Sequence, residues 1–97
     1  MHAYLISYDL SSPGQDYASL IDAIKALSKT WWHHLDSTWI IRHPGPATEI
    51  RDALSPHIDS NDELLVVQLT GTAAWTGFDQ KGSDWLKNNL SPTPASL

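Results

Sequence analysis

The order of the hydrophobic patterns along this 97-residue chain constrains its fold more than any other feature. Residues 2–10 are rich in Tyr, Ile and Leu and alternate in part between apolar and polar side chains, which predicts a first strand. A helix start follows, with Ser12 as the N-cap, Pro13 at the first helical position and Gln15 completing a capping box. We expect this helix to end near residues 28–30. Its apolar positions recur at the spacing of one helical face: Tyr17, Leu20, Ile21, Ile24 and Leu27.

The middle of the chain continues with two strands, a helix and a further strand. The stretch "TWWHHLDSTWIIRH" is too long for one average strand, and Asp36-Ser37 is its natural break, which predicts strands at residues 31–35 and 37–42. Pro46 begins a second helix, which Pro56 ends early. Residues 63–69 are apolar at nearly every position, which predicts a central strand. The apolar face of the second helix consists of Ile50, Ala53 and Leu54.

This order, β-α-β-β-α-β, predicts an α+β fold of the ferredoxin-like type, the split-βαβ plait. Both helices should then cover one face of a four-stranded antiparallel sheet. Apolar side chains also appear on the other side of these strands, and an open apolar sheet face predicts a homodimer.

A short extension follows the predicted plait. The stretch "GTAAWTGF" (71–78) is expected to form an extended arm, with a fifth strand as an alternative. Ser83 could cap a last helix that runs through Leu90. We therefore expect one domain over residues 1–90 and a frayed tail over residues 91–97.

Composition narrows the class of protein and its surroundings. The longest purely apolar run, residues 64–67, is far shorter than the ~20 residues that span a bilayer, so no membrane partner is expected. The N-terminus lacks the pattern of a signal peptide, and a cytoplasmic location is expected. The chain has no cysteine, which excludes disulfides and thiolate metal sites, and its net charge of −5 does not favour binding to nucleic acid through phosphates.

Several of these segments resemble a known family. The stretch "YLISYDL", the capped helix, "STWII" and "NDELLVVQL" are similar to the CRISPR-associated adaptation protein, a small ferredoxin-like dimer that bridges the spacer integrase. They look closer still to its acidic stand-alone relatives, labelled SinR-like, and the virulence-associated protein D toxins share the general plan. The resemblance covers residues 1–69. It implies a homodimer, with a role in defence or in a toxin–antitoxin pair.

The resemblance also implies a candidate site at Asp9. In the family, the aspartate that closes the first strand lies near the dimer axis and is assigned as a ligand for a divalent metal in RNA or DNA cleavage. Asp9 is the matching position, and Ser37 matches the family's serine before an aromatic. Two Asp9 carboxylates could share one Mg²⁺ or Mn²⁺ across a two-fold axis. Unlike the family, this chain has no Lys or Arg between Asp9 and Lys25.

Asp9 has a structural interpretation as well, since an aspartate at the end of a strand commonly accepts hydrogen bonds from the following turn. His33 and His34 are neighbours in a predicted strand and should point to opposite faces. One of them could act as a general base near Asp9, and the simpler interpretation is a polar side chain at a strand edge. The sequence contains no His-x-His or His-x-x-x-His spacing and no cysteine, so it gives little support to a zinc site.

The five tryptophans could stack on bases, and the pairing of Trp39 with Arg42 is the most suggestive for nucleic acid or a protein partner. Packing in the core or in a dimer is the alternative that the acidic composition favours. Two functions therefore stay open. One is a dimeric binding or scaffold protein without robust catalysis, and the other is a metal-dependent endonuclease or toxin-like ribonuclease that uses Asp9 from both subunits.

Overall fold

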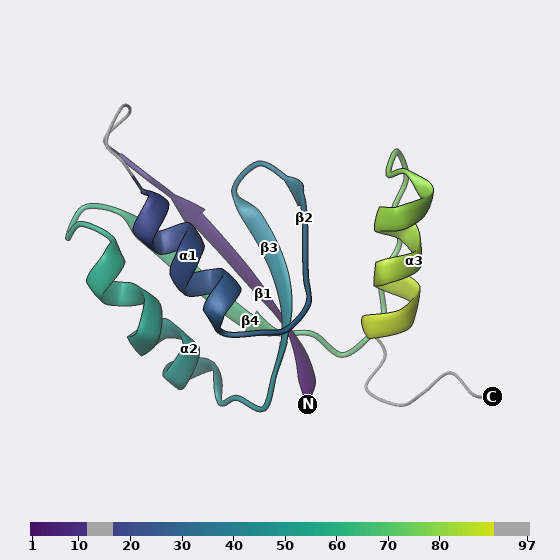
Figure 1. Ribbon diagram of the computed structural model, residues 1–97, viewed down its shortest axis with the longest axis horizontal. Coiled ribbons are helices and arrows are strands. Elements are labelled where there is room, and N and C mark those ends of the chain that lie inside the picture. Colours follow the sequence, from purple (N-terminus) through teal and green to yellow (C-terminus); the bar gives the residue numbers. More distant parts are fainter. Residues whose placement is uncertain (12–16, 91–97) are drawn as a thin grey trace.

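Four antiparallel strands form one open sheet in the spatial order β2-β3-β1-β4 (Figure 1). The computed structural model describes residues 1–11 and 17–90, and this part of the chain is α+β. The sheet contains β1 (His2–Asp9), β2 (Trp31–Leu35), β3 (Thr38–His43) and β4 (Glu63–Gln68). The described helices are α1 (Ala18–Ala26), α2 (Ala47–Leu54), a short 3-10 turn η1 (Ser55–His57) and α3 (Gln80–Asn89).

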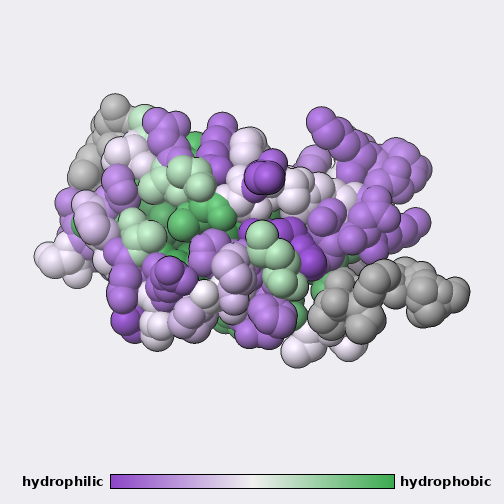
Figure 2. Space-filling view, turned by 60° about the horizontal axis from the view of Figure 1, so that its bottom comes forward, coloured by the Kyte–Doolittle hydropathy of each residue, from purple (hydrophilic) through white to green (hydrophobic). Residues whose placement is uncertain are grey.

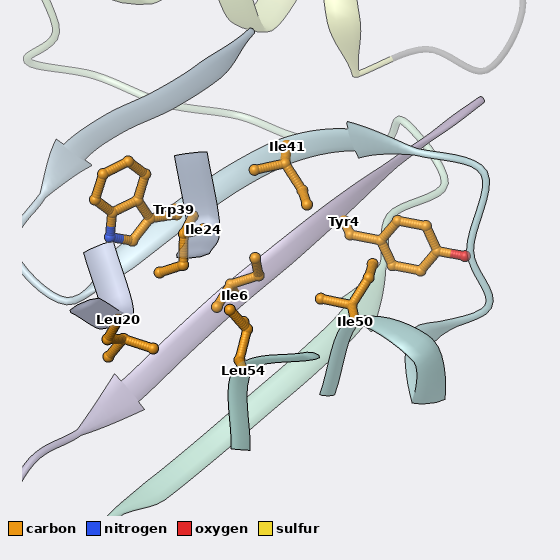
Figure 3. Close-up of a cluster of buried hydrophobic side chains, with 8 residues drawn as sticks. All are labelled: Tyr4, Ile6, Leu20, Ile24, Trp39, Ile41, Ile50 and Leu54. Atoms are coloured by element: carbon orange, nitrogen blue, oxygen red, sulfur yellow. The ribbon is translucent and has the colours of Figure 1, made fainter. Parts of the chain in front are cut away.

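Helices α1 and α2 lie side by side over one face of the sheet, and their buried side chains form the main core (Figure 1). Figure 3 shows Tyr4 and Ile6 of β1 on the side of the sheet that faces the two helices. Each of these large apolar side chains contributes about 1.5–3 kcal/mol when it is removed from water. The cluster consists of Tyr4, Ile6, Leu20, Ile24, Trp39, Ile41, Ile50 and Leu54.

The predicted strands agree with the observed ones to within one residue at each end. The helix start predicted at Ser12, Pro13 and Gln15 lies outside the described residues. Within the described residues, the first helical residue is Ala18. The α1 helix ends at Ala26, two to four residues before the predicted end at residues 28–30. The second helix begins after Pro46 and gives way to η1, which contains Pro56 near its start. Ala53 is exposed and does not belong to the buried face, because the helix turns it away from the sheet.

The prediction of a central position for the last strand is wrong. β4 lies at the edge of the sheet and pairs with β1 alone among the described strands. Leu64 and Val66 pack against the main core, whereas Leu65 and Val67 point to the other face and are 56% and 39% exposed. The run of apolar residues therefore reflects two apolar faces at an edge and not burial between two strands.

The hairpin of β2 and β3 turns at Asp36 and Ser37, as predicted. Trp32 pairs with Ile40, and Leu35 pairs with Thr38. The two residues His33 and His34 therefore lie opposite the single residue Trp39 of β3. This two-against-one arrangement is a β-bulge, and it increases the local twist of the edge strand.

The chain's own C-terminal extension covers part of the face opposite α1 and α2. In Figure 1, α3 stands on the other side of the sheet from α1 and α2. A second cluster of buried residues forms there from β1, β2, β3 and the end of α3: Ala3, Trp32, Ile40, Leu86 and Leu90. The expectation that this whole face is bare and needs a second subunit is therefore wrong for its β2–β3 half.

The extension differs from the alternative of a fifth strand and from the predicted start of the last helix. Residues 71–78 form no strand, because the sheet has four strands in the described part of the chain. Helix α3 begins at Gln80 with Asp79 as its N-cap, and the Asp79 side chain accepts a 2.8 Å hydrogen bond from the backbone N–H of Gly82. Ser83 lies inside this helix, where its hydroxyl accepts a 3.3 Å hydrogen bond from the Trp75 indole. Within residues 1–11 and 17–90, no helix has the length and hydrophobicity that crossing a bilayer requires.

Candidate functional site

The candidate residue Asp9 lies at the last position of β1, directly opposite Glu63 at the first position of β4. Residues directly opposite each other in an antiparallel pair share one face, so both exposed carboxylates lie on the face away from α1 and α2. They border a shallow hollow together with Ser7 and Leu65. The structure thus adds to Asp9 a second carboxylate that the sequence pattern did not single out.

Two carboxylates in direct opposition repel each other unless a cation lies between them. Oxygen donors of this kind suit a hard divalent cation such as Mg²⁺ or Mn²⁺. The described residues contain no group of three or more His, Asp or Glu side chains that could hold a metal ion. A cation at Asp9 and Glu63 would therefore need water or a second copy of the chain for its remaining ligands.

The two predicted histidines do not join Asp9. His33 stacks on Trp39 with ring centroids 3.7 Å apart, and its Nε2 lies 3.0 Å from the carbonyl oxygen of Asp36. His34 packs on the other side of the sheet, against Trp32 and Phe78. The prediction that these neighbours point to opposite faces is confirmed, and the structure gives each one a packing role near the hairpin.

Ser37 and Trp39 are both engaged inside the fold. The backbone carbonyl of Ser37 accepts a 3.1 Å hydrogen bond from the Tyr8 N–H. Trp39 is 1% exposed, and its indole donates a 3.1 Å hydrogen bond to the Tyr8 hydroxyl. The ring of Trp39 is thus a core element in this structure and not a surface for stacking on bases.

Arg42 is also occupied by contacts within the chain. Its guanidinium donates a 2.6 Å hydrogen bond to the carbonyl oxygen of Asn89 and a 3.4 Å bond to that of Met1. A cation at the last turn of a helix is favourable because the unpaired carbonyls there carry partial negative charge. Arg42 therefore holds the C-terminal end of α3 against β3.

A second candidate site is an apolar pocket of about 340 Å³ that sequence patterns did not reveal. The far face of the sheet contributes Trp32 and Ile40 to its lining, and the last turns of α3 contribute Leu86 and Leu90. The segment 69–78 supplies the third wall. No periodicity links the strands, the segment 69–78 and α3, so the sequence gives no sign of this shared surface beyond the aromatic residues of "GTAAWTGF".

Electrostatics sets the two candidate sites apart. The Asp9 end offers two exposed carboxylates and no ion pair, since Arg51 with Asp52 forms the one salt bridge found across the described residues. The pocket is lined by apolar side chains, threonines and a glycine, without a charged group among the described residues. One site could take a cation, and the other could take a neutral molecule.

Together these features define a small α+β domain with one antiparallel sheet, helices on both of its faces and two candidate binding sites. Neither a family model, nor a curated protein, nor a solved structure matches this chain.

Proposed function

We propose that this protein is a ferredoxin-like binding or scaffold protein that works as a homodimer. The β-α-β-β-α-β order and the strand order β2-β3-β1-β4 support the plait. The observation that carries the dimer is the exposure of Leu65 and Val67, at 56% and 39%, on the half of the far face that α3 does not cover. The resemblance to the CRISPR adaptation dimer points the same way.

These two residues form one continuous surface with the neighbouring strand. Val67 pairs with Leu5 of β1, and we call Leu5, Leu65 and Val67 the β4 patch. Figure 2 shows that hydrophobic residues come to the surface over the body of the domain, whereas the outer side of α3 is almost wholly hydrophilic. An apolar patch beside an unpaired strand edge favours a self-complementary contact between two copies.

Sedimentation equilibrium tests the dimer. The wild-type chain is expected to sediment as a dimer at micromolar concentration, and Leu65→Asp should sediment as a monomer because a charge replaces the apolar contact. Leu35→Asp is the matched control, since Leu35 is 49% exposed at the opposite edge of the sheet. A folded wild type that stays monomeric would overturn the proposal, and so would a Leu65→Asp variant that remains dimeric.

The second candidate function is metal-dependent cleavage of RNA or DNA. The observation that favours it is the opposition of Asp9 and Glu63 beside Leu65, which would bring four carboxylates near the axis of the proposed dimer. A bound Mg²⁺ or Mn²⁺ would supply an activated water for attack on a phosphodiester. The chain has only six Lys and Arg residues. Binding of a nucleic acid substrate would therefore depend on the surface of the whole dimer and not on a basic patch of one subunit.

Incubation of end-labelled RNA and DNA with the protein in Mg²⁺ or Mn²⁺ tests this second function. Cleavage should disappear in Asp9→Asn and in Glu63→Gln, while both variants stay dimeric. Asp52→Asn is the control, because Asp52 lies on α2 and pairs with Arg51. Absence of cleavage by wild type, or cleavage retained by Asp9→Asn, would leave the scaffold function as the conclusion.

A further inference from the structure

The two edge strands of the sheet differ in how they are protected against pairing with another chain. β2 carries the bulge at His33 and His34, which interrupts its register with β3. β4 runs opposite β1 without a register shift along its whole length, and residues 64–68 contain no charge, proline or glycine. Native proteins blunt exposed edges with bulges, charges or prolines. The β4 edge lacks these devices and is therefore suited to pairing with another strand.

The hydrogen bonds around β1 show which backbone groups of β4 point outward. The N–H of Leu69, directly after β4, donates a 2.8 Å bond to the carbonyl oxygen of Ala3 in β1. The N–H of Tyr8 donates instead to Ser37, directly before β3. Because bonded and non-bonded pairs alternate along an antiparallel ladder, the odd-numbered residues of β4 bond to β1. The even-numbered residues therefore direct their backbone N–H and C=O groups to the open edge: Leu64, Val66 and Gln68.

We infer that two copies of this chain pair their β4 strands antiparallel across a two-fold axis at Val66. The two sheets then form one continuous sheet of eight strands, four from each copy. This inference rests on the proposed function, because it specifies how the homodimer is held together. Val66 lies opposite its own copy, and Leu64 lies opposite the partner's Gln68. In each of these pairs the outward-pointing backbone groups meet and can exchange two N–H···O=C bonds.

The side chains select this register. A two-fold axis perpendicular to the sheet keeps corresponding faces on the same side, so Leu65 lies opposite the partner's Val67 and the two β4 patches meet as one apolar strip. A shift by two residues in one direction places the charged Glu63 opposite the partner's Val67, which is unfavourable. A shift in the other direction leaves only residues 66–68 of each β4 paired. The register centred on Val66 therefore pairs the longest uncharged stretch.

This arrangement closes at two copies. The contact is isologous and uses the regular edge of each sheet, so the edges that stay open in the dimer are the two bulged β2 strands. A strand rises about 3.3 Å per residue, so Glu63 lies about 10 Å from the axis and the two copies of Glu63 lie about 20 Å apart. A cation at Asp9 and Glu63 is then held by one chain alone, and the metal-dependent function needs a different dimer.

Disulfide formation tests the register directly, because the chain contains no cysteine. Leu65→Cys and Val67→Cys chains are prepared separately, mixed and exposed to oxidised glutathione. The mixture should form the linked dimer at least roughly tenfold faster than either variant alone, because only residues 65 and 67 of different copies lie directly opposite. Equal residues of the two copies are diagonal neighbours about 7–8 Å apart, at or beyond the reach of a disulfide. Faster linking by either variant alone would overturn this register.

Gln68→Pro tests the backbone bonds between the copies. The N–H of Gln68 points to the open edge, so proline removes a bond to the partner and no bond of the β1–β4 ladder. The dissociation constant of the dimer should rise roughly tenfold or more, because two such bonds are lost per dimer. Gln68→Ala is the matched control and should dimerise like wild type. It also removes the acceptor of the 3.3 Å bond from the Tyr4 hydroxyl, and it keeps the backbone N–H.

The results separate this inference from the proposed function. A wild-type chain that is monomeric in sedimentation equilibrium overturns the homodimer and the β4 pairing together. A dimeric wild type overturns the β4 pairing alone if Gln68→Pro dimerises as tightly as Gln68→Ala. The same holds if the cysteine mixture forms the linked dimer no faster than the single variants. If Gln68→Pro does not fold, the cysteine experiment still decides.

Discussion

The indole nitrogen of Trp85 donates a 2.7 Å hydrogen bond to the hydroxyl of Thr30, 55 residues earlier in the chain. Trp85 lies on α3, and Thr30 directly precedes β2. Together with the bond from Arg42 to the carbonyl of Asn89, this contact fastens α3 to the sheet. The wall that α3 contributes to the pocket therefore depends on two specific polar contacts as well as on apolar packing.

Loss of the contact between Trp85 and Thr30 should loosen α3 selectively. Trp85→Phe is expected to lower the free energy of unfolding by about 1 kcal/mol, because it removes one hydrogen bond and leaves most of the ring. Hydrogen exchange should become faster in α3 and stay unchanged in β1. Trp31→Phe is the control, since Trp31 is 38% exposed. The one ring contact described for Trp31 is with the ammonium of Lys25, which lies over the indole. Equal exchange in both variants would contradict the anchoring role.

Removal of the Tyr8 hydroxyl should destabilise the main core. Tyr8→Phe leaves the indole N–H of the buried Trp39 without its acceptor, which costs about 1–3 kcal/mol. Urea denaturation measures this loss as a lower transition midpoint with an unchanged slope. Tyr4→Phe is a useful comparison, because the Tyr4 hydroxyl donates only a long, 3.3 Å bond to Gln68. A Tyr8→Phe midpoint equal to that of wild type would show that the bond contributes nothing.

Gly45 should tolerate no side chain. Its φ of +78° lies in the left-handed region, and a Cβ there would clash with the hydroxyl of Tyr4. Gly77 has a similar φ of +94° with nothing within 4 Å of a Cβ. Gly45→Ala and Gly77→Ala should both cost about 1 kcal/mol of backbone strain. We expect a further loss in Gly45→Ala alone, visible as a lower urea midpoint, and equal midpoints would contradict the clash.

The Asp62 carboxylate should make stability depend on pH in the acid range. Backbone N–H groups of Ser11 and Asp59, each at 2.8 Å, and the hydroxyls of Ser11 and Tyr17 hold the pKa of Asp62 below its usual value. A lowered pKa in the folded state means that this contribution is complete above the ordinary carboxyl pKa. The contribution is lost as pH falls through the lowered value.

Urea midpoints measured between pH 7 and pH 3 test this dependence. Asp62→Asn should be less stable than wild type at pH 7, and the difference should shrink toward pH 3. Asp22→Asn removes the same charge from the exposed side of α1 and serves as the control. A constant difference between Asp62→Asn and wild type across the range would contradict the assigned role.

Local patterns predicted the elements well because each strand and helix here carries its own periodicity. The break at Asp36-Ser37 and the helix after Pro46 follow from turn chemistry and from the fixed φ of proline. The edge position of β4 could not be predicted from its sequence. A run of apolar residues indicates apolar surroundings on both faces of a strand, but it does not indicate that the strand has a neighbour on each side. The start of α3 was misplaced because Asp79 and Ser83 are both good N-caps, and the choice depends on packing.

The candidate site was predictable only in part. Asp9 was found from its place at the end of the first strand, and Glu63 was missed because its relation to Asp9 is a matter of strand register. The pocket could not be predicted at all, since its lining comes from β1, β2, β3, the segment 69–78 and α3. Pairs of residues far apart in the chain leave no trace in local periodicity.

By itself, the sequence determined the order of strands and helices, the main core positions and the acidic, cysteine-free character of the protein. The order of the elements and the core positions depend on residues that are close together in the sequence. The charge and the lack of cysteine depend on composition alone. The tertiary structure alone decided that α3 covers half of the second sheet face, that Leu65 and Val67 stay exposed and that Trp32 lines a pocket without a partner for its N–H. The physical reason is that docking of the C-terminal extension is a long-range packing event, selected by the shape and polarity of surfaces that exist only once the sheet has formed.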